Sequence, residues 1–161
     1  DICFLPHGNY QKLVVEEMKG KPESGNIVTE DGEVLGKHNG LFNYTIGQRK
    51  GLGIAYKHPL YVIGFNGDRN EVIVGPNERL FTNRMICKFY NFLDDTIHKE
   101  LKAEGKIRYA ANPSPCTARI LDDDTMEVIF EEPQRAITPG QSVAFYNGTQ
   151  LLGGAVIDRV C

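Results

Sequence analysis

The sequence predicts a mainly β protein: a small central β module with long loops, followed by a six-stranded antiparallel β-barrel. Two observations favour this fold class. Short runs rich in β-branched and aromatic residues recur through the second half of the chain, and turn signals such as Asn147-Gly148 separate them. In the first half, Asp31-Gly32 divides two short runs, which is typical of a hairpin. Helical periodicity is confined to one short stretch near the N-terminus.

That stretch predicts the first element, a helix at residues 10–19. Asn9 stands where a side chain caps the helix, and the apolar residues that follow fall on one stripe. Gly20 ends the helix, and Pro22 prevents its continuation. Residues 1–24 therefore form a separate N-terminal segment with one short helix.

Residues 25–83 are expected to form the central β module. Its predicted strands span residues 26–30, 33–36, 60–65 and 71–74. A Gly-rich stretch, residues 36–54, joins the two predicted hairpins and makes the longest loop of the module.

Residues 84–161 are expected to form the barrel. Its predicted strands span residues 85–91, 101–109, 117–121, 126–130, 141–146 and 151–158. Closing the sheet into a barrel removes the exposed edges that an open sheet would offer to other chains.

The Gly-rich loop is also basic. No Asp or Glu lies between Glu33 and Asp68, whereas this interval holds several cations, including Arg49 and Lys50. In a chain of net charge -3 this run makes a local positive field, which attracts phosphates. Two alternatives remain open, namely a solvated loop tip and a nucleotide-binding loop. The glycine spacing does not fit a Walker-type phosphate loop.

Composition excludes several classes of protein. No apolar run approaches the ~20 residues that span a bilayer, and no signal peptide is recognisable. The four cysteines include no C-x-x-C pair, so we expect neither a metal site nor a disulfide framework, but reduced thiols in a cytoplasmic protein. Cys87 is interpreted as a strand core residue and Cys116, in a Pro-Ser-Pro-Cys loop, as structural. His38 is interpreted as a hydrogen-bonding loop residue, and residues 122–124 as a solvated turn.

Five segments, in order along the chain, resemble the motifs of one family. They are Asp1–Pro6, Tyr44–Ile54, Lys106–Tyr109, Pro133–Gln141 and Leu152–Ile157. Together they are similar to the bacterial tRNA-specific 2-thiouridylases, the MnmA/TrmU family. In one motif the family's second arginine is replaced by Ala110.

The resemblance implies a function. It identifies residues 1–24 as the tail of a catalytic domain, with Cys3 as the catalytic cysteine that carries a persulfide intermediate. It implies ATP-dependent 2-thiolation of the wobble uridine (U34) of tRNA, with tRNA contacts at Arg108, Tyr109 and Gln141. From the charge of the Gly-rich loop we add Arg49 and Lys50 as candidate tRNA-binding residues.

The implied partners are tRNA, a sulfur-relay protein or cysteine desulfurase, and the catalytic domain of the same chain. The family's Ser-Gly-Gly-x-Asp-Ser loop, which binds ATP, and its first catalytic cysteine do not occur in this sequence. We therefore expect a C-terminal fragment of the enzyme that is inactive alone. The alternative is a stand-alone RNA- or protein-binding β module without catalysis. The context of Cys3 separates the two, since a binding module has no use for it.

Overall fold

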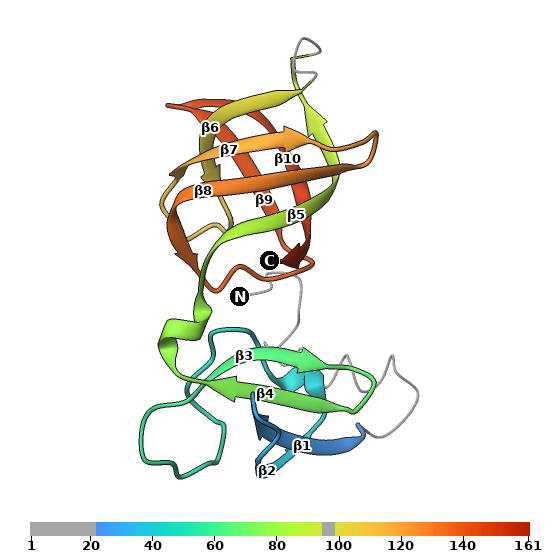
Figure 1. The fold of residues 1–161 in the computed structure, drawn as a ribbon, viewed down its shortest axis with the longest axis vertical. Helices are drawn as coiled ribbons and strands as arrows, with labels where there is room; N and C mark the ends of the chain where they lie inside the picture. Colours follow the sequence, from blue (N-terminus) through green and yellow to red (C-terminus); the bar gives the residue numbers. More distant parts are fainter. Residues whose placement is uncertain (1–21, 95–98) are drawn as a thin grey trace, which may run out of the picture. The chain divides into compact units, whose positions relative to one another are not determined.

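The computed structural model describes residues 22–94 and 99–161 (Figure 1). The predicted helix at residues 10–19 and Cys3 lie outside the described residues. The chain divides into two compact units, which meet between Asn77 and Glu78 in the sequence. The domain boundaries at residues 24/25 and 83/84 stay a prediction.

The first unit is a four-stranded sheet in the order β2-β1-β4-β3. Its strands are β1 (Ser24–Thr29), β2 (Val34–Asn39), β3 (Tyr61–Asn66) and β4 (Glu71–Gly75). Both predicted hairpins are confirmed, β1 with β2 and β3 with β4. The two hairpins join through β1 and β4, which run parallel. Residues 40–60 make the connection between the hairpins, and they include the basic Gly-rich loop.

That connection also takes part in the core of the first unit. Leu52 and Leu60 are buried together with Ile27, Val62 and Val72 of the sheet. A loop that contributes its own apolar side chains to a core is held in a defined shape, because leaving would expose them to water. The loop is therefore an ordered part of the unit.

The second unit is a closed barrel, as predicted, with strand order β10-β5-β8-β7-β6-β9 and antiparallel pairing throughout. Its strands are β5 (Phe81–Phe92), β6 (Glu100–Lys106), β7 (Ser114–Ile120), β8 (Thr125–Arg135), β9 (Ser142–Asn147) and β10 (Gln150–Val160). Figure 1 shows the strands wrapping around one interior.

The barrel interior is filled by side chains from every strand, among them Met85, Phe130 and Phe145. Gly105 on β6 has a steric reason to be glycine. A Cβ there would lie 2.8 Å from the Phe130 ring and 2.9 Å from Sγ of Cys116. The large Phe130 ring therefore occupies the space beside the bare β6 backbone.

Several strand ends differ from the prediction: β2 runs three residues further than expected, β5 begins four residues earlier, and β7 begins three residues earlier. The ends of β6 and β8 matter most for the site. β6 was expected to continue to residue 109, but it ends at Lys106, and Ala111 N–H then donates to Arg108 O across a turn (3.1 Å). β8 was expected to end at residue 130 but continues to Arg135. It tolerates Pro133 because the β5–β8 register is interrupted there, so no ladder hydrogen bond is required of the proline.

Candidate nucleic-acid interface

The predicted tRNA-binding residues fall on two surfaces, one in each unit. Arg49 and Lys50 lie in the connection between β2 and β3. Arg108, Tyr109 and Gln141 lie in turns of the barrel.

The loop that carries Arg49 is fastened to β3 through its neighbours. Gly47 N–H donates to Val62 O (2.8 Å), and Val62 N–H donates to Gln48 O (2.9 Å). The Gln48 side chain closes the turn from inside, since its Oε1 accepts from Thr45 N–H (3.0 Å) and its Nε2 donates to Lys50 O (3.0 Å). Gly47 and Gln48 therefore stabilise the loop conformation in which Arg49 and Lys50 are held.

The glycines of this loop are required by backbone geometry. Gly47, Gly51 and Gly53 have φ angles of 86°, 80° and 67°, a region that glycine adopts without strain. Arg49 and Lys50 sit between these turns, and both are exposed. The loop therefore displays two neighbouring cations on a defined backbone.

His38 is a structural residue, in agreement with the sequence interpretation. It is 1% exposed. Its Nδ1 accepts from Gly40 N–H (3.1 Å), and its Nε2 lies 3.0 Å from Asn70 O. A carbonyl can only accept, so the ring is the Nε2–H tautomer. The edge of Tyr44 also meets the ring, with centroids 5.8 Å apart. Both nitrogens are occupied, which leaves neither for chemistry on a substrate.

In the barrel, the three predicted residues lie at the same end. β6 and β8 end there, and β7 and β9 begin there, as the pairs Lys106–Ala144 and Phe81–Arg135 show. We call this end the Arg108 rim and define it as residues 106–113 and 135–141. Sequence separation hides this proximity, because the turns that carry Arg108 and Gln141 belong to different strand connections.

At the Arg108 rim, Arg108 Nη2 donates to Arg135 O (2.6 Å), which fixes the guanidinium over the end of β8 and leaves its other donors for a ligand. Tyr109 is 96% exposed, and Lys106 Nζ lies 5.6 Å from the centre of its ring. The backbone of Gln141 is bound on both sides, to Thr138 O and Ile157 N–H, while the residue is exposed. Lys106 beside Tyr109 is a pairing that the sequence motif did not reveal.

The two ends of the barrel differ in charge. Residues 106–113 and 135–141 contain Lys106, Arg108 and Arg135 and no acid. The described turns at the opposite end contain Asp94, the run Asp122 to Asp124 and one cation, Lys99, so acids predominate there. A polyanion is therefore attracted to the Arg108 rim and repelled by the other end.

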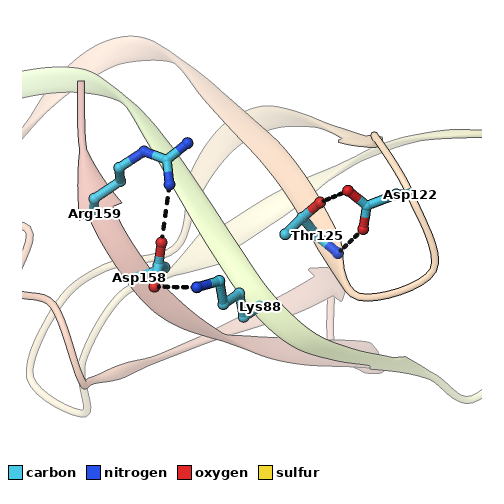
Figure 2. A network of polar contacts seen from close by, with 5 residues as sticks. All are labelled: Lys88, Asp122, Thr125, Asp158 and Arg159. Atoms are coloured by element: carbon cyan, nitrogen blue, oxygen red, sulfur yellow. Dashed lines mark hydrogen bonds and ion pairs between the residues drawn. The ribbon is translucent and has the colours of Figure 1, made fainter.

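In the acidic hairpin between β7 and β8, the Asp122 carboxylate accepts its hydrogen bonds from residues of the same turn. Asp122 accepts from the backbone N–H of Asp124. It also accepts from both the N–H and the hydroxyl of Thr125 (Figure 2). The Thr125 hydroxyl is the first cause of the lowered pKa of Asp122. These bonds define a turn, as the sequence suggested. Across the described part of the chain, no group of His, Cys, Asp or Glu is placed to hold a metal ion.

On β10, Asp158 joins two cations. Lys88 Nζ lies 2.9 Å from its Oδ1, and Arg159 Nη1 lies 3.1 Å from its Oδ2 (Figure 2). The hydrogen bond from Lys88 is the main cause of the lowered pKa of Asp158. This network ties β5 to β10 on the outside of the barrel.

The two cysteines of the barrel interior are not placed for catalysis. Cys87 and Cys116 are buried in the barrel, and burial raises the pKa of each thiol to about 12. Cys161 is exposed at the end of the chain. Among the described residues no helix is long and apolar enough to cross a membrane.

Comparison with known proteins gives matches along nearly the whole chain. Residues 12–76 match the tRNA methyl transferase PRC-barrel domain, and residues 82–157 match the aminomethyltransferase beta-barrel domain. The chain is 44% identical over 160 residues to the tRNA-specific 2-thiouridylase MnmA of Clostridioides difficile, 45% identical over 161 residues to MnmA 1 of Clostridium tetani, and 44% identical over 159 residues to MnmA of Geotalea uraniireducens.

In each case 99% of this chain is covered, but the chain spans only 44%, 44% and 42% of the length of these relatives. The similarity therefore concerns the two units described here and the segment before them.

Proposed function

The chain belongs to the family of the tRNA-specific 2-thiouridylases, and we propose that it is the C-terminal part of an enzyme that 2-thiolates the wobble uridine (U34) of tRNA. The observation that carries this proposal is the continuity of the similarity: 44% identity extends over 99% of the chain, through both domains and the segment that contains Cys3. A module recruited for binding alone would not be expected to match in all three parts.

In the proposed reaction, the C2 oxygen of the uridine is adenylated with ATP, which makes it a good leaving group. ATP is assigned to the enzyme as a whole, since this sequence lacks the family's Ser-Gly-Gly-x-Asp-Ser loop. The sulfur arrives as a persulfide on Cys3, supplied by a sulfur-relay protein or a cysteine desulfurase.

The proposed sulfur step uses two cysteines. A thiolate from a second cysteine of the enzyme attacks Sγ of Cys3, so that a disulfide forms and hydrosulfide is released. Hydrosulfide attacks C2 of the uridine, and AMP leaves. The two electrons lost by the thiols reduce the transferred sulfur, so the disulfide must be reduced before the next turnover.

We assign to the described units the task of holding the tRNA. On the Arg108 rim, the guanidinium of Arg108 and the exposed ring of Tyr109 suit a phosphate and a stacked base or ribose, and Gln141 adds a side-chain amide. In the first unit, Arg49 and Lys50 suit further phosphates. Such contacts position the RNA and read little of its sequence. The reaction is assigned to the cytoplasm.

The direct test is Cys3→Ser in the complete enzyme, with 2-thiouridine in tRNA measured by mass spectrometry. A serine hydroxyl cannot carry a persulfide, so we expect product to be lost while ATP-dependent adenylation of tRNA persists. Cys161→Ser is the matched control and should retain activity. If the Cys3→Ser enzyme thiolates tRNA as well as the natural enzyme does, Cys3 has no catalytic role. The alternative of a binding module would then be favoured for this chain. The 161-residue chain alone should form no product.

A further inference from the structure

The connection between β2 and β3 lines an open hollow of about 580 Å³, of which the proposed function involves only Arg49. It is lined by Arg49 and by residues 51–60. The apolar residues of this segment turn inward: Leu52 and Leu60 are buried, and Ile54 and Tyr56 pack on the core of the unit. The residues between these apolar positions are exposed. The apolar contacts with the sheet therefore hold the backbone of residues 51–60 in place, and the exposed residues face solvent.

The polar side chains around the hollow are cationic or hydrogen-bonding. Lys57 Nζ lies 5.7 Å from the centre of the Tyr56 ring, and the His58 ring meets Tyr56 edge-on with centroids 5.0 Å apart. Arg49 lies on the same lining. In the part of the chain that the structure describes, neither Arg49 nor Lys57 forms an ion pair. No acid lies between Glu33 and Asp68 to neutralise them.

The backbone of the same segment also offers donors. Within the described residues, the N–H groups from Gly51 to His58 donate to no backbone carbonyl. Gly51 and Gly53 have positive φ, and a Cβ at Gly53 would meet nothing within 4 Å, so a ligand can approach this backbone closely. Amides without a backbone acceptor, on a curved backbone beside two cations, are the components from which anion-binding concavities are built.

The geometry points to a phosphate-binding site in the 49–60 hollow, with Arg49 and Lys57 as the charged ligands, the amides of residues 51–58 as neutral donors, and the Tyr56 ring as a stacking face. The chemistry fits a phosphodiester of an RNA strand or the phosphates of a free nucleotide or pyrophosphate. For the RNA source the inference rests on the proposed function, and it places a tRNA phosphate in the first unit.

The test is a titration of the isotope-labelled chain, followed by amide chemical shifts in NMR spectra. The probes are inorganic pyrophosphate, AMP, a ten-nucleotide single-stranded RNA and tRNA. We expect at least one probe to shift the amides of residues 51–58. The double variant Arg49→Ala/Lys57→Ala should weaken this binding at least about tenfold, since hydrogen bonds to charged groups are being removed. The matched control is Arg69→Ala, an exposed arginine of the same unit that does not line the hollow.

The probes separate the sources of phosphate. If both RNAs shift the amides of residues 51–58 but pyrophosphate and AMP do not, the site binds a nucleic-acid strand. If pyrophosphate or AMP shifts these amides but neither RNA does, the site binds a free nucleotide or pyrophosphate. If tRNA shifts the Arg108 rim while no probe shifts residues 51–58, the inference is overturned and the proposed function stands. If tRNA shifts neither surface and no other probe shifts residues 51–58, both the inference and the proposed function fail. Equal binding by the double variant and the control also overturns the inference. Unchanged β3 and β4 amides in the free double variant confirm that it is folded.

Discussion

At the scale of single residues, the barrel thiols show how burial decides reactivity. With the pKa of Cys87 and of Cys116 at about 12, only about one thiol in ten thousand is a thiolate at pH 8. We expect iodoacetamide at pH 8 to modify Cys161 quickly and the two buried thiols only through unfolding. Peptide mass spectrometry over time measures this, and the same reaction in urea is the control, where all three should react. Labelling of Cys87 as fast as Cys161 in the native protein would contradict the buried placement.

His38 connects several separate segments of the first unit through its buried ring. It connects Gly40, Asn70 and Tyr44, and a Cβ at Gly25 would lie only 2.5 Å from its Nε2. His38→Ala should lower the free energy of unfolding of this unit by about 2–4 kcal/mol, because a cavity forms and a buried donor loses its acceptor. Urea unfolding of the chain measures the loss.

The matched variant for this measurement is His58→Ala, since His58 belongs to the same unit but is exposed. Its effect on stability should stay within about 0.5 kcal/mol. A His38→Ala protein as stable as the His58→Ala protein would mean that the buried contacts contribute little.

At the scale of elements, the β5–β10 pairing carries a pH-dependent contact. The folded-state pKa of Asp158 is lowered by Lys88 first, so its carboxylate stabilises the fold above the ordinary aspartate pKa of about 4. This contribution is lost as the pH falls through the folded-state pKa. The difference in stability between the natural protein and Asp158→Asn should therefore be present at pH 7 and shrink below pH ~4, as thermal unfolding across pH can measure.

A control for the acid effect is Asp123→Asn, in the β7–β8 hairpin. The carboxylate of Asp123 has no hydrogen bond or ion pair among the described residues, so its replacement should change the acid unfolding profile much less. A difference for Asp158→Asn that persists unchanged at pH 2 would show that the ion pairs with Lys88 and Arg159 are not its origin.

At the scale of the whole molecule, charge is separated although the net charge is -3. The chain should bind tRNA weakly and with strong salt dependence. Arg108→Ala should lower the slope of log affinity against log salt concentration by about one unit, because one phosphate contact is lost. Titration of tRNA at several salt concentrations measures the slope. Arg119→Ala, which removes an arginine paired with Glu100, is the control and should leave it unchanged. Equal slopes for the two variants would exclude the Arg108 rim as a phosphate contact.

By itself the sequence determined the fold class, both hairpins of the first unit and all six barrel strands, because alternating apolar residues and turn signals such as Asp31-Gly32 act over a few neighbouring positions. It also located the cations of the basic loop and assigned structural roles to His38 and Cys87. The sequence did not predict where β6 ends. Arg108 and Tyr109 are residue types that also occur in strands, and only the structure shows the turn in which Ala111 N–H donates to Arg108 O.

Only the tertiary structure decided what depends on distant parts of the chain meeting. The parallel pairing of β1 with β4 joins strands more than 40 residues apart, and no local signal specifies it. Barrel closure brings the turns of Arg108 and Gln141 to one rim. The burial of Leu52 and Leu60 makes part of the Gly-rich loop the lining of a hollow. The physical reason is the same in each case: local preferences select elements, whereas the burial of apolar surface between remote segments decides which elements meet.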